Sequence, residues 1–193
     1  YFYTYVLGDM KLMSGVSVIG LIASLVGIVM GPYLANRFGK KKVYLTAVII
    51  STALNLLRLL DVTSMILIYI SALIGGVAGG WMVPVNTSIQ ADNTTYVQYK
   101  TGKRAEAAIA SLTSFVSKVA QGLGGAIPGY VIAAYGFVTG ASVQPESINT
   151  GIILCALILP LIFGILGLLI FGTQYTLDQK AVIEMDAKIN RNN

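Results

Sequence analysis

Five long stretches without a single Asp, Glu, Lys or Arg decide what this chain can fold into. They are residues 12–36, 43–57, 62–91, 119–145 and 147–177. A helix needs roughly 20 mostly apolar residues to cross the hydrocarbon core of a bilayer, and four of these stretches are long enough. The shortest, 43–57, is extended by Arg58, whose long side chain can reach the interface. Only 11% of all residues are charged, against about a quarter in soluble domains. The sequence therefore predicts an all-α, polytopic membrane protein.

We expect residues 1–172 to form one partial and four to five full transmembrane segments. The partial segment ends near Leu7, and the full ones cover 16–36, 43–60, 64–87, 105–137 and 148–171. Residues 173–193 are expected to form a tail with a short amphipathic helix, because its apolar residues alternate with charged ones. Since residue 1 is Tyr and the first seven residues resemble the last two turns of a helix, we expect the chain to be a fragment.

The basic residues indicate how the segments are oriented. Ten of the 13 lysines and arginines fall at 37–42, 100–104 and 180–191. Such a bias predicts that these three regions lie in the cytoplasm, and we expect a multi-pass protein of the cell (plasma) membrane. The net charge of +5 is divided among short loops, so it does not indicate a nucleic-acid partner.

Several kinds of chemistry are not expected from these residues. The chain has no histidine and one cysteine, Cys155, which leaves no disulfide framework and no Cys/His metal site. No carboxylate pair falls at membrane depth, and no nucleophile has a base beside it. We therefore expect no enzyme, no cofactor and no metal site within this fragment.

One lysine stands where hydrophobicity argues against a charge. Lys118 follows Arg104 by fourteen residues, which at about 1.5 Å per residue places it roughly 21 Å along the helix. An ammonium at that depth costs several kcal/mol unless it is paired or hydrated, so such a position is by default a functional one. No acidic residue of the chain is expected at the same depth, so its partner is expected outside the fragment. Its helical face is polar at spacings of three and four: Ser111, Ser114, Lys118 and Gln121. For the serines, hydrogen bonding between helices is the alternative.

Glycine and proline are frequent inside the apolar stretches. Gly75–Gly80 and Gly122–Gly125 carry small residues at spacings that let helix backbones approach closely. Pro32, Pro84, Pro128 and Pro160 are each expected to bend a helix. Bent, glycine-rich helices suit a transporter, but they also suit any tightly packed polytopic protein.

The segment that precedes the Lys118 helix carries a resemblance to a known family. It contains Asp92, Tyr96 and then Tyr99-Lys100-Thr101-Gly102-Lys103-Arg104-Ala105-Glu106, followed by Phe115, Lys118, Gly122 and Gly124-Gly125. This pattern resembles the glycoside–pentoside–hexuronide:cation symporters, the melibiose-permease-like branch of the major facilitator superfamily. The loop 36–42 also looks like that superfamily's loop between two helices. The resemblance covers the whole chain as the C-terminal half, from the end of helix VII to helix XII.

The resemblance implies a secondary active transporter that couples Na⁺ or H⁺ to a sugar or glycoside by alternating access. Its partner would be an N-terminal six-helix half, and Lys118 would lie beside a cation site formed by carboxylates of that half. Thr113 and Ser114 match positions that face the sugar. The candidate substrate and cation site comprises Trp81, Asn86, Thr113, Ser114, Lys118 and Gln121.

A second implied site is a charged network at the cytoplasmic gate, to which Asp92 and Arg104 match. The candidate gate comprises Arg37, Asp92, Lys103, Arg104 and Glu106. The sequence departs from the family there, because Thr95-Tyr96-Val97-Gln98 stands where D-Y-G-E is usual, and Asn36 where Asp is common. For Lys103 and Arg104, a purely topological role is the alternative.

Three alternatives stay open at this point. Trp81 could stack on a sugar, with the Asn86 amide on its hydroxyls, or it could be a packing or interfacial tryptophan. The transporter could move a lysolipid-type substrate instead of a sugar. The two missing acids at Thr95 and Gln98 also admit a non-transporting membrane sensor or scaffold of the same fold.

Overall fold

The structure is a computed structural model that describes residues 1–141 and 143–191. This part of the chain is helical throughout and contains no strand. Seven α-helices and two π-helical turns follow one another: η1 (Phe2–Val6), α1 (Lys11–Phe38), α2 (Lys40–Leu60), α3 (Met65–Thr101), α4 (Glu106–Ala134), α5 (Ser147–Ile153), η2 (Leu154–Ile158), α6 (Leu159–Gln174) and α7 (Gln179–Arg191). The all-α expectation is confirmed.

Four of these helical segments are long and apolar enough to cross a membrane: α1, α2, α3 and the continuous stretch Ser147–Gln174. Each has the length that a bilayer requires. Helix α4 has 29 residues and is therefore also long enough, but it is not among the four. Its composition explains the difference, because every 18-residue stretch of α4 includes Lys118, which lowers the mean hydropathy of the stretch. The protein is a multi-pass membrane protein.

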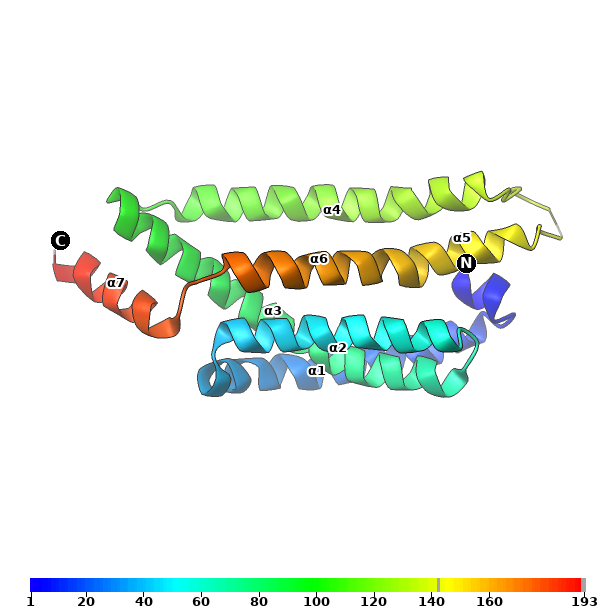
Figure 1. The fold of residues 1–193 in the computed structure, drawn as a ribbon, viewed down its shortest axis with the longest axis horizontal. Helices are drawn as coiled ribbons and strands as arrows, with labels where there is room; N and C mark the ends of the chain where they lie inside the picture. Colours follow the sequence, from blue (N-terminus) through cyan, green and yellow to red (C-terminus); the bar gives the residue numbers. More distant parts are fainter. Residues whose placement is uncertain (142, 192–193) are drawn as a thin grey trace.

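The long helices lie side by side and present two distinct ends (Figure 1). One end carries residues 37–42, residues 100–106 and α7, and we call it the basic end. The opposite end carries η1, the start of α1, residues 61–64 and α5. The three basic regions of the sequence therefore lie close together in space. Each of them begins or ends a helix at the same end of the bundle.

Glycines determine where two of the helices end. Gly39 separates α1 from α2 with a φ of 88°, and Gly102 ends α3 with a φ of 68°. Both values lie in the left-handed region that glycine adopts without strain. Gly102 thus marks the break between α3 and α4. The membrane segment expected to end at residue 87 lies within α3, which continues for about four further turns beyond that residue.

Helices α1 and α3 pack closely through glycine. A Cβ added at Gly80 would collide with the backbone of Ser24, and one added at Gly27 would collide with the backbone of Val77. The close approach expected from the Gly75–Gly80 string is therefore present. The glycines at 122, 124 and 125 on α4 have nothing within 4 Å of a Cβ built on them, so they do not pack against the described part of the chain.

Prolines coincide with irregular helix geometry. Helix α3, which contains Pro84, changes direction along its length in Figure 1, as expected where a proline removes a backbone hydrogen bond. Pro160 stands at the start of α6, directly after the π-helical turn η2. A wider turn before a proline accommodates the missing N–H.

Candidate functional site

Helix α4 holds its predicted site residues away from the rest of the bundle. Residues 110–127 are all exposed. Among the described elements, the main contacts of α4 are with α3, α5 and η2. The Lys118 ammonium donates to Oε1 of Gln121 at 3.4 Å, one turn further along the same face. The Thr113 hydroxyl donates to the carbonyl of Ile109 at 2.9 Å, which satisfies it within the helix.

Lys118 has no carboxylate partner among the described residues, whose two ion pairs both lie at the basic end. The side chain is exposed rather than buried, and its one polar contact is a long hydrogen bond to a neutral amide. The structure thus brings Lys118 and Gln121 together, with Ser114 exposed on the same helix. A cation at the middle of a long helix, open on all sides, is a group available to a partner that approaches α4.

A short, largely buried ion pair joins Lys40 at the start of α2 to Asp92 in α3. Lys40 Nζ lies 2.7 Å from each carboxylate oxygen of Asp92. The side chain of Asp92 is 9% exposed and that of Lys40 is 18% exposed, so the pair is held largely out of solvent. Two short, charge-assisted hydrogen bonds therefore connect two helices at the basic end.

Beside this ion pair lies a cavity of about 230 Å³, lined by residues 38–42, Asp92 and residues 175–179. Tyr175, which follows α6, has a buried hydroxyl without a hydrogen-bond partner in the described structure. Its burial, together with the negative charge of Asp92, raises the pKa of Tyr175 to about 12. Both effects disfavour the phenolate. Tyr175, the residue directly after α6, therefore interacts electrostatically with Asp92 of the Lys40–Asp92 pair.

The remaining residues of the predicted gate do not join this pair. Arg104 Nη2 lies 2.8 Å from Glu106 Oε1, and both side chains are more than half exposed. The hydrogen bond and the charge of Glu106 raise the pKa of Arg104. Arg37 donates to the Tyr33 hydroxyl at 3.2 Å. Lys103 is exposed.

The predicted gate therefore separates into a local Arg104–Glu106 pair and an inter-helix pair at Asp92. The partner of Asp92, Lys40, was absent from the predicted gate. The sequence offered one signal for it: Lys40 directly follows the helix-ending Gly39 in a run of three lysines, at the same end of the bundle as Asp92.

Trp81 and Asn86 lie on different surfaces of α3. Trp81 packs against the buried cluster of Ala35, Val43, Val85 and Ile89. Its indole N–H is buried without a partner among the described residues. Asn86 is exposed. The surroundings of Trp81 favour the packing interpretation, whereas Asn86 stays accessible to a ligand.

The fold and these charges define a class: a helical multi-pass membrane protein with an exposed lysine along a long helix and a largely buried ion pair at one end. Comparison with known proteins agrees. The profile of the MFS/sugar transport protein family matches residues 1–179. The chain belongs to this family, and the resemblance to the glycoside–pentoside–hexuronide:cation symporters is confirmed.

Three relatives illustrate the relationship. A putative sulfoquinovose importer of Escherichia coli (strain K12) is 25% identical over 99% of this chain and 41% of its own length. The glucuronide carrier protein homolog of the same organism is 30% identical over 96% of the chain and 42% of its own length. The isoprimeverose transporter of Lactiplantibacillus pentosus is 28% identical over 77% of the chain and 31% of its own length. The chain thus spans about two-fifths or less of the length of these relatives.

Proposed function

We propose that this chain is the C-terminal six-helix half of a cation-coupled sugar symporter, paired in the membrane with an N-terminal half. The observation that carries the proposal is the exposed Lys118 on an unpacked α4. A helix that offers a cation and a row of open glycines needs a partner to cover it in a bilayer. The family match and the limited coverage of the relatives support the same conclusion.

The proposed substrate is a small-molecule sugar or glycoside, because the relatives' names specify sulfoquinovose, isoprimeverose and a glucuronide. It would bind between the two halves near the midplane and be transported by alternating access, without enzymatic conversion. Thr113, Ser114, Gln121 and Asn86 supply exposed hydroxyl and amide groups for sugar hydroxyls.

The proposed coupling mechanism uses the charge of Lys118. Carboxylates of the N-terminal half would bind Na⁺ or H⁺, and Lys118 would pair with them when the cation is absent. Cation binding then releases Lys118 and shifts the population between two states of the transporter. The basic end would face the cytoplasm of a plasma-membrane protein, as the lysine and arginine bias supports. There the Lys40–Asp92 pair would hold the helices of this half together at the inner gate.

Cation-dependent uptake by the full-length protein tests this proposal. In Lys118→Ala, sugar uptake should lose its dependence on Na⁺ or on the proton gradient, whereas Lys118→Arg should retain part of it. Lys180→Ala, which removes a lysine from α7, is the matched control and should transport like the wild type. Unchanged coupling in Lys118→Ala would exclude the proposed role. An absence of uptake by the wild type, whichever sugar and cation are supplied, would favour a sensor or scaffold.

A further inference from the structure

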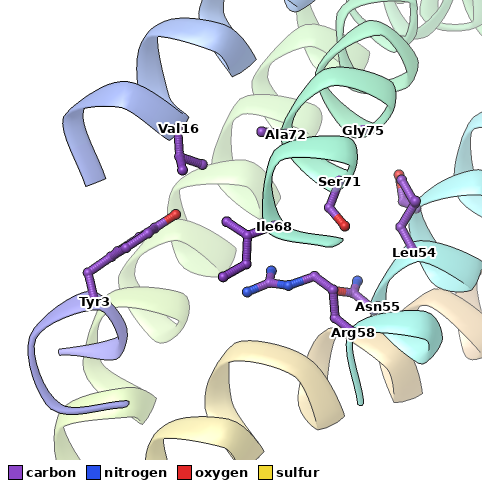
Figure 2. A pocket seen from close by; sticks show the side chains of 10 residues that line it. Tyr3, Val16, Leu54, Asn55, Arg58, Ile68, Ser71, Ala72 and Gly75 are labelled. Atoms are coloured by element: carbon purple, nitrogen blue, oxygen red, sulfur yellow. The ribbon is translucent and has the colours of Figure 1, made fainter. Parts of the chain in front are cut away.

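A polar cavity lies at the end of the bundle opposite the basic end, away from the Lys118 stripe and the Lys40–Asp92 pair. It has a volume of about 220 Å³ and opens between η1, α1, α2 and α3. Figure 2 shows the side chains of Tyr3, Arg58 and Ser71 directed into it, each from a different element, with Asn55 beside Arg58. Helix α4 contributes none of the lining residues, so this cavity is distinct from the Lys118 stripe.

Arg58 dominates the electrostatics of this cavity. Its side chain is half-buried, and the Nε–H is buried without a hydrogen-bond partner in the described part of the chain. On one side the guanidinium lies over the ring of Phe2, with Cζ 5.1 Å from the ring centroid. That contact satisfies a face of the cation but none of its five N–H donors.

Two acidic residues at this end of the bundle, Asp61 and Asp9, are engaged in local hydrogen bonds. Asp61, three residues after Arg58, accepts hydrogen bonds from the backbone N–H and the hydroxyl of Thr63 at 3.1 and 3.0 Å. Asp9 accepts from the backbone N–H of Lys11 at 2.8 Å. Neither of these carboxylates, nor that of Glu146 at the start of α5, forms an ion pair with Arg58, since both ion pairs of the described residues involve other groups. The charge of Arg58 is therefore uncompensated.

The other polar groups of the cavity add donors rather than charge. The Ser71 hydroxyl is buried and has no partner among the described residues. Asn55, Ser51 and the Tyr3 hydroxyl complete the polar lining. A half-buried guanidinium and an unpartnered hydroxyl that face one cavity are costly unless something accepts their hydrogen bonds. The group that compensates both the charge and the donors is an anion with several oxygen atoms.

We propose that this cavity is an oxyanion-binding site, in which Arg58 pairs with a carboxylate, sulfonate or phosphate group and Ser71 donates to one of its oxygens. Arginine suits this task because its planar fork binds two oxygens of such a group at once. The volume has room for several waters, at about 30 Å³ each, and therefore for an oxyanion head. The rest of the ligand would extend out of the cavity.

Two sources can supply this chemistry: a soluble oxyanion or the phosphate of an anionic lipid in the adjacent leaflet. Thermal unfolding of the full-length protein distinguishes them. In neutral detergent, inorganic phosphate and methanesulfonate are titrated separately, with sodium chloride at matched ionic strength as reference. In nanodiscs, phosphatidylglycerol is compared with phosphatidylcholine, in the absence of added phosphate.

A soluble ligand should raise the Tm of the wild type in detergent beyond the chloride reference. A lipid ligand should raise it only in phosphatidylglycerol nanodiscs. In either case Arg58→Gln should weaken the apparent affinity for the ligand about tenfold or more. That is the loss expected when a hydrogen bond to a charged group is removed. Arg191→Gln, which removes an exposed arginine from α7 at the basic end, should respond like the wild type.

Ser71→Ala provides a second variant in case Arg58→Gln fails to fold, and it should weaken the response while preserving the net charge. The proposal is overturned if neither source stabilises the protein beyond its reference. It is equally overturned if Arg58→Gln and Ser71→Ala respond as strongly as the wild type. Because the readout is ligand-dependent stability rather than uptake, failure here leaves the proposed transport function untouched.

Discussion

Lys40 and Asp92 are fifty-two residues apart in sequence, yet Lys40 Nζ lies 2.7 Å from both carboxylate oxygens of Asp92. The contact joins the first residue of α2 to a point in α3 that lies beyond the predicted membrane segment. Because both side chains are largely removed from solvent, the loss of one partner leaves the other buried and uncompensated. Such an arrangement makes the pair a structural clamp at the basic end.

We expect Asp92→Asn to lower the free energy of unfolding by about 1.5–3 kcal/mol, the range for hydrogen bonds to charged groups. Lys40→Gln should cost a similar amount. A double-mutant cycle on thermal unfolding of the full-length protein measures how far the two losses overlap.

The exposed Arg104–Glu106 pair is the control for the clamp. It has a similar separation of 2.8 Å, but solvent screens it, so Glu106→Gln should leave the Tm nearly unchanged. Equal effects of Asp92→Asn and Glu106→Gln, or additive effects of Asp92→Asn and Lys40→Gln, would argue against the clamp.

Tyr175 should make the folded protein sensitive to high pH. Its pKa is raised from the usual value near 10 to about 12, so between these two values the folded state holds a proton that the unfolded state has lost. The contribution of Tyr175 to the free energy of unfolding therefore stays constant below pH 10 and falls as the pH rises towards 12. Absorbance titration of tyrosinate should show one late-titrating group fewer in Tyr175→Phe than in the wild type.

The same substitution tests the orphaned hydroxyl. Because the Tyr175 hydroxyl has no hydrogen-bond partner in the described structure, Tyr175→Phe should not destabilise the protein at neutral pH. It should also reduce the loss of stability above pH 10. A clear drop in Tm at pH 7 would mean that the hydroxyl has a partner in the full-length protein.

The sequence predicted the helices well because charges and glycines delimit them. Each predicted membrane segment overlaps a helix of the structure. The predicted membrane segment stops at residue 87, because hydrophobicity reports where a helix leaves the bilayer, whereas the helix itself continues through Asp92 to Thr101. Polar residues form helix as readily as apolar ones when their backbone groups stay paired.

The candidate site was less predictable, because its contacts are long-range. The polar stripe of α4 could be inferred from spacing along one helix, since its residues are close in sequence. The Lys40–Asp92 pair and the Arg58 cavity each depend on how separate helices pack. The glycine strings show the same limit: Gly75–Gly80 and Gly122–Gly125 are alike in sequence, but only the first meets another helix.

This contrast between glycines can be tested within one helix. In Gly80→Ala the new methyl group collides with the Ser24 backbone, so α1 and α3 must separate, at a cost of about 1–3 kcal/mol. In Gly79→Ala nothing lies within 4 Å of the new methyl group, and helix propensity favours alanine. In thermal unfolding, the Tm of Gly79→Ala should equal or exceed that of the wild type, and the Tm of Gly80→Ala should be lower. The reverse order would mean that the α1–α3 contact is looser than the structure has it.

Trp81 provides the last test, because it separates packing from substrate binding. Its ring packs against Val43 and Val85 in a buried cluster, and its N–H finds no acceptor there. Trp81→Phe keeps an aromatic ring and removes the unpaired donor, so it should cost less than about 1.5 kcal/mol and leave the half-saturation constant for sugar uptake unchanged. Asn86→Ala is the counterpart, since this exposed amide is accessible to a ligand. It should raise that constant without lowering the Tm. If instead Trp81→Phe weakens sugar uptake while the Tm stays constant, Trp81 contacts the substrate in the full-length protein.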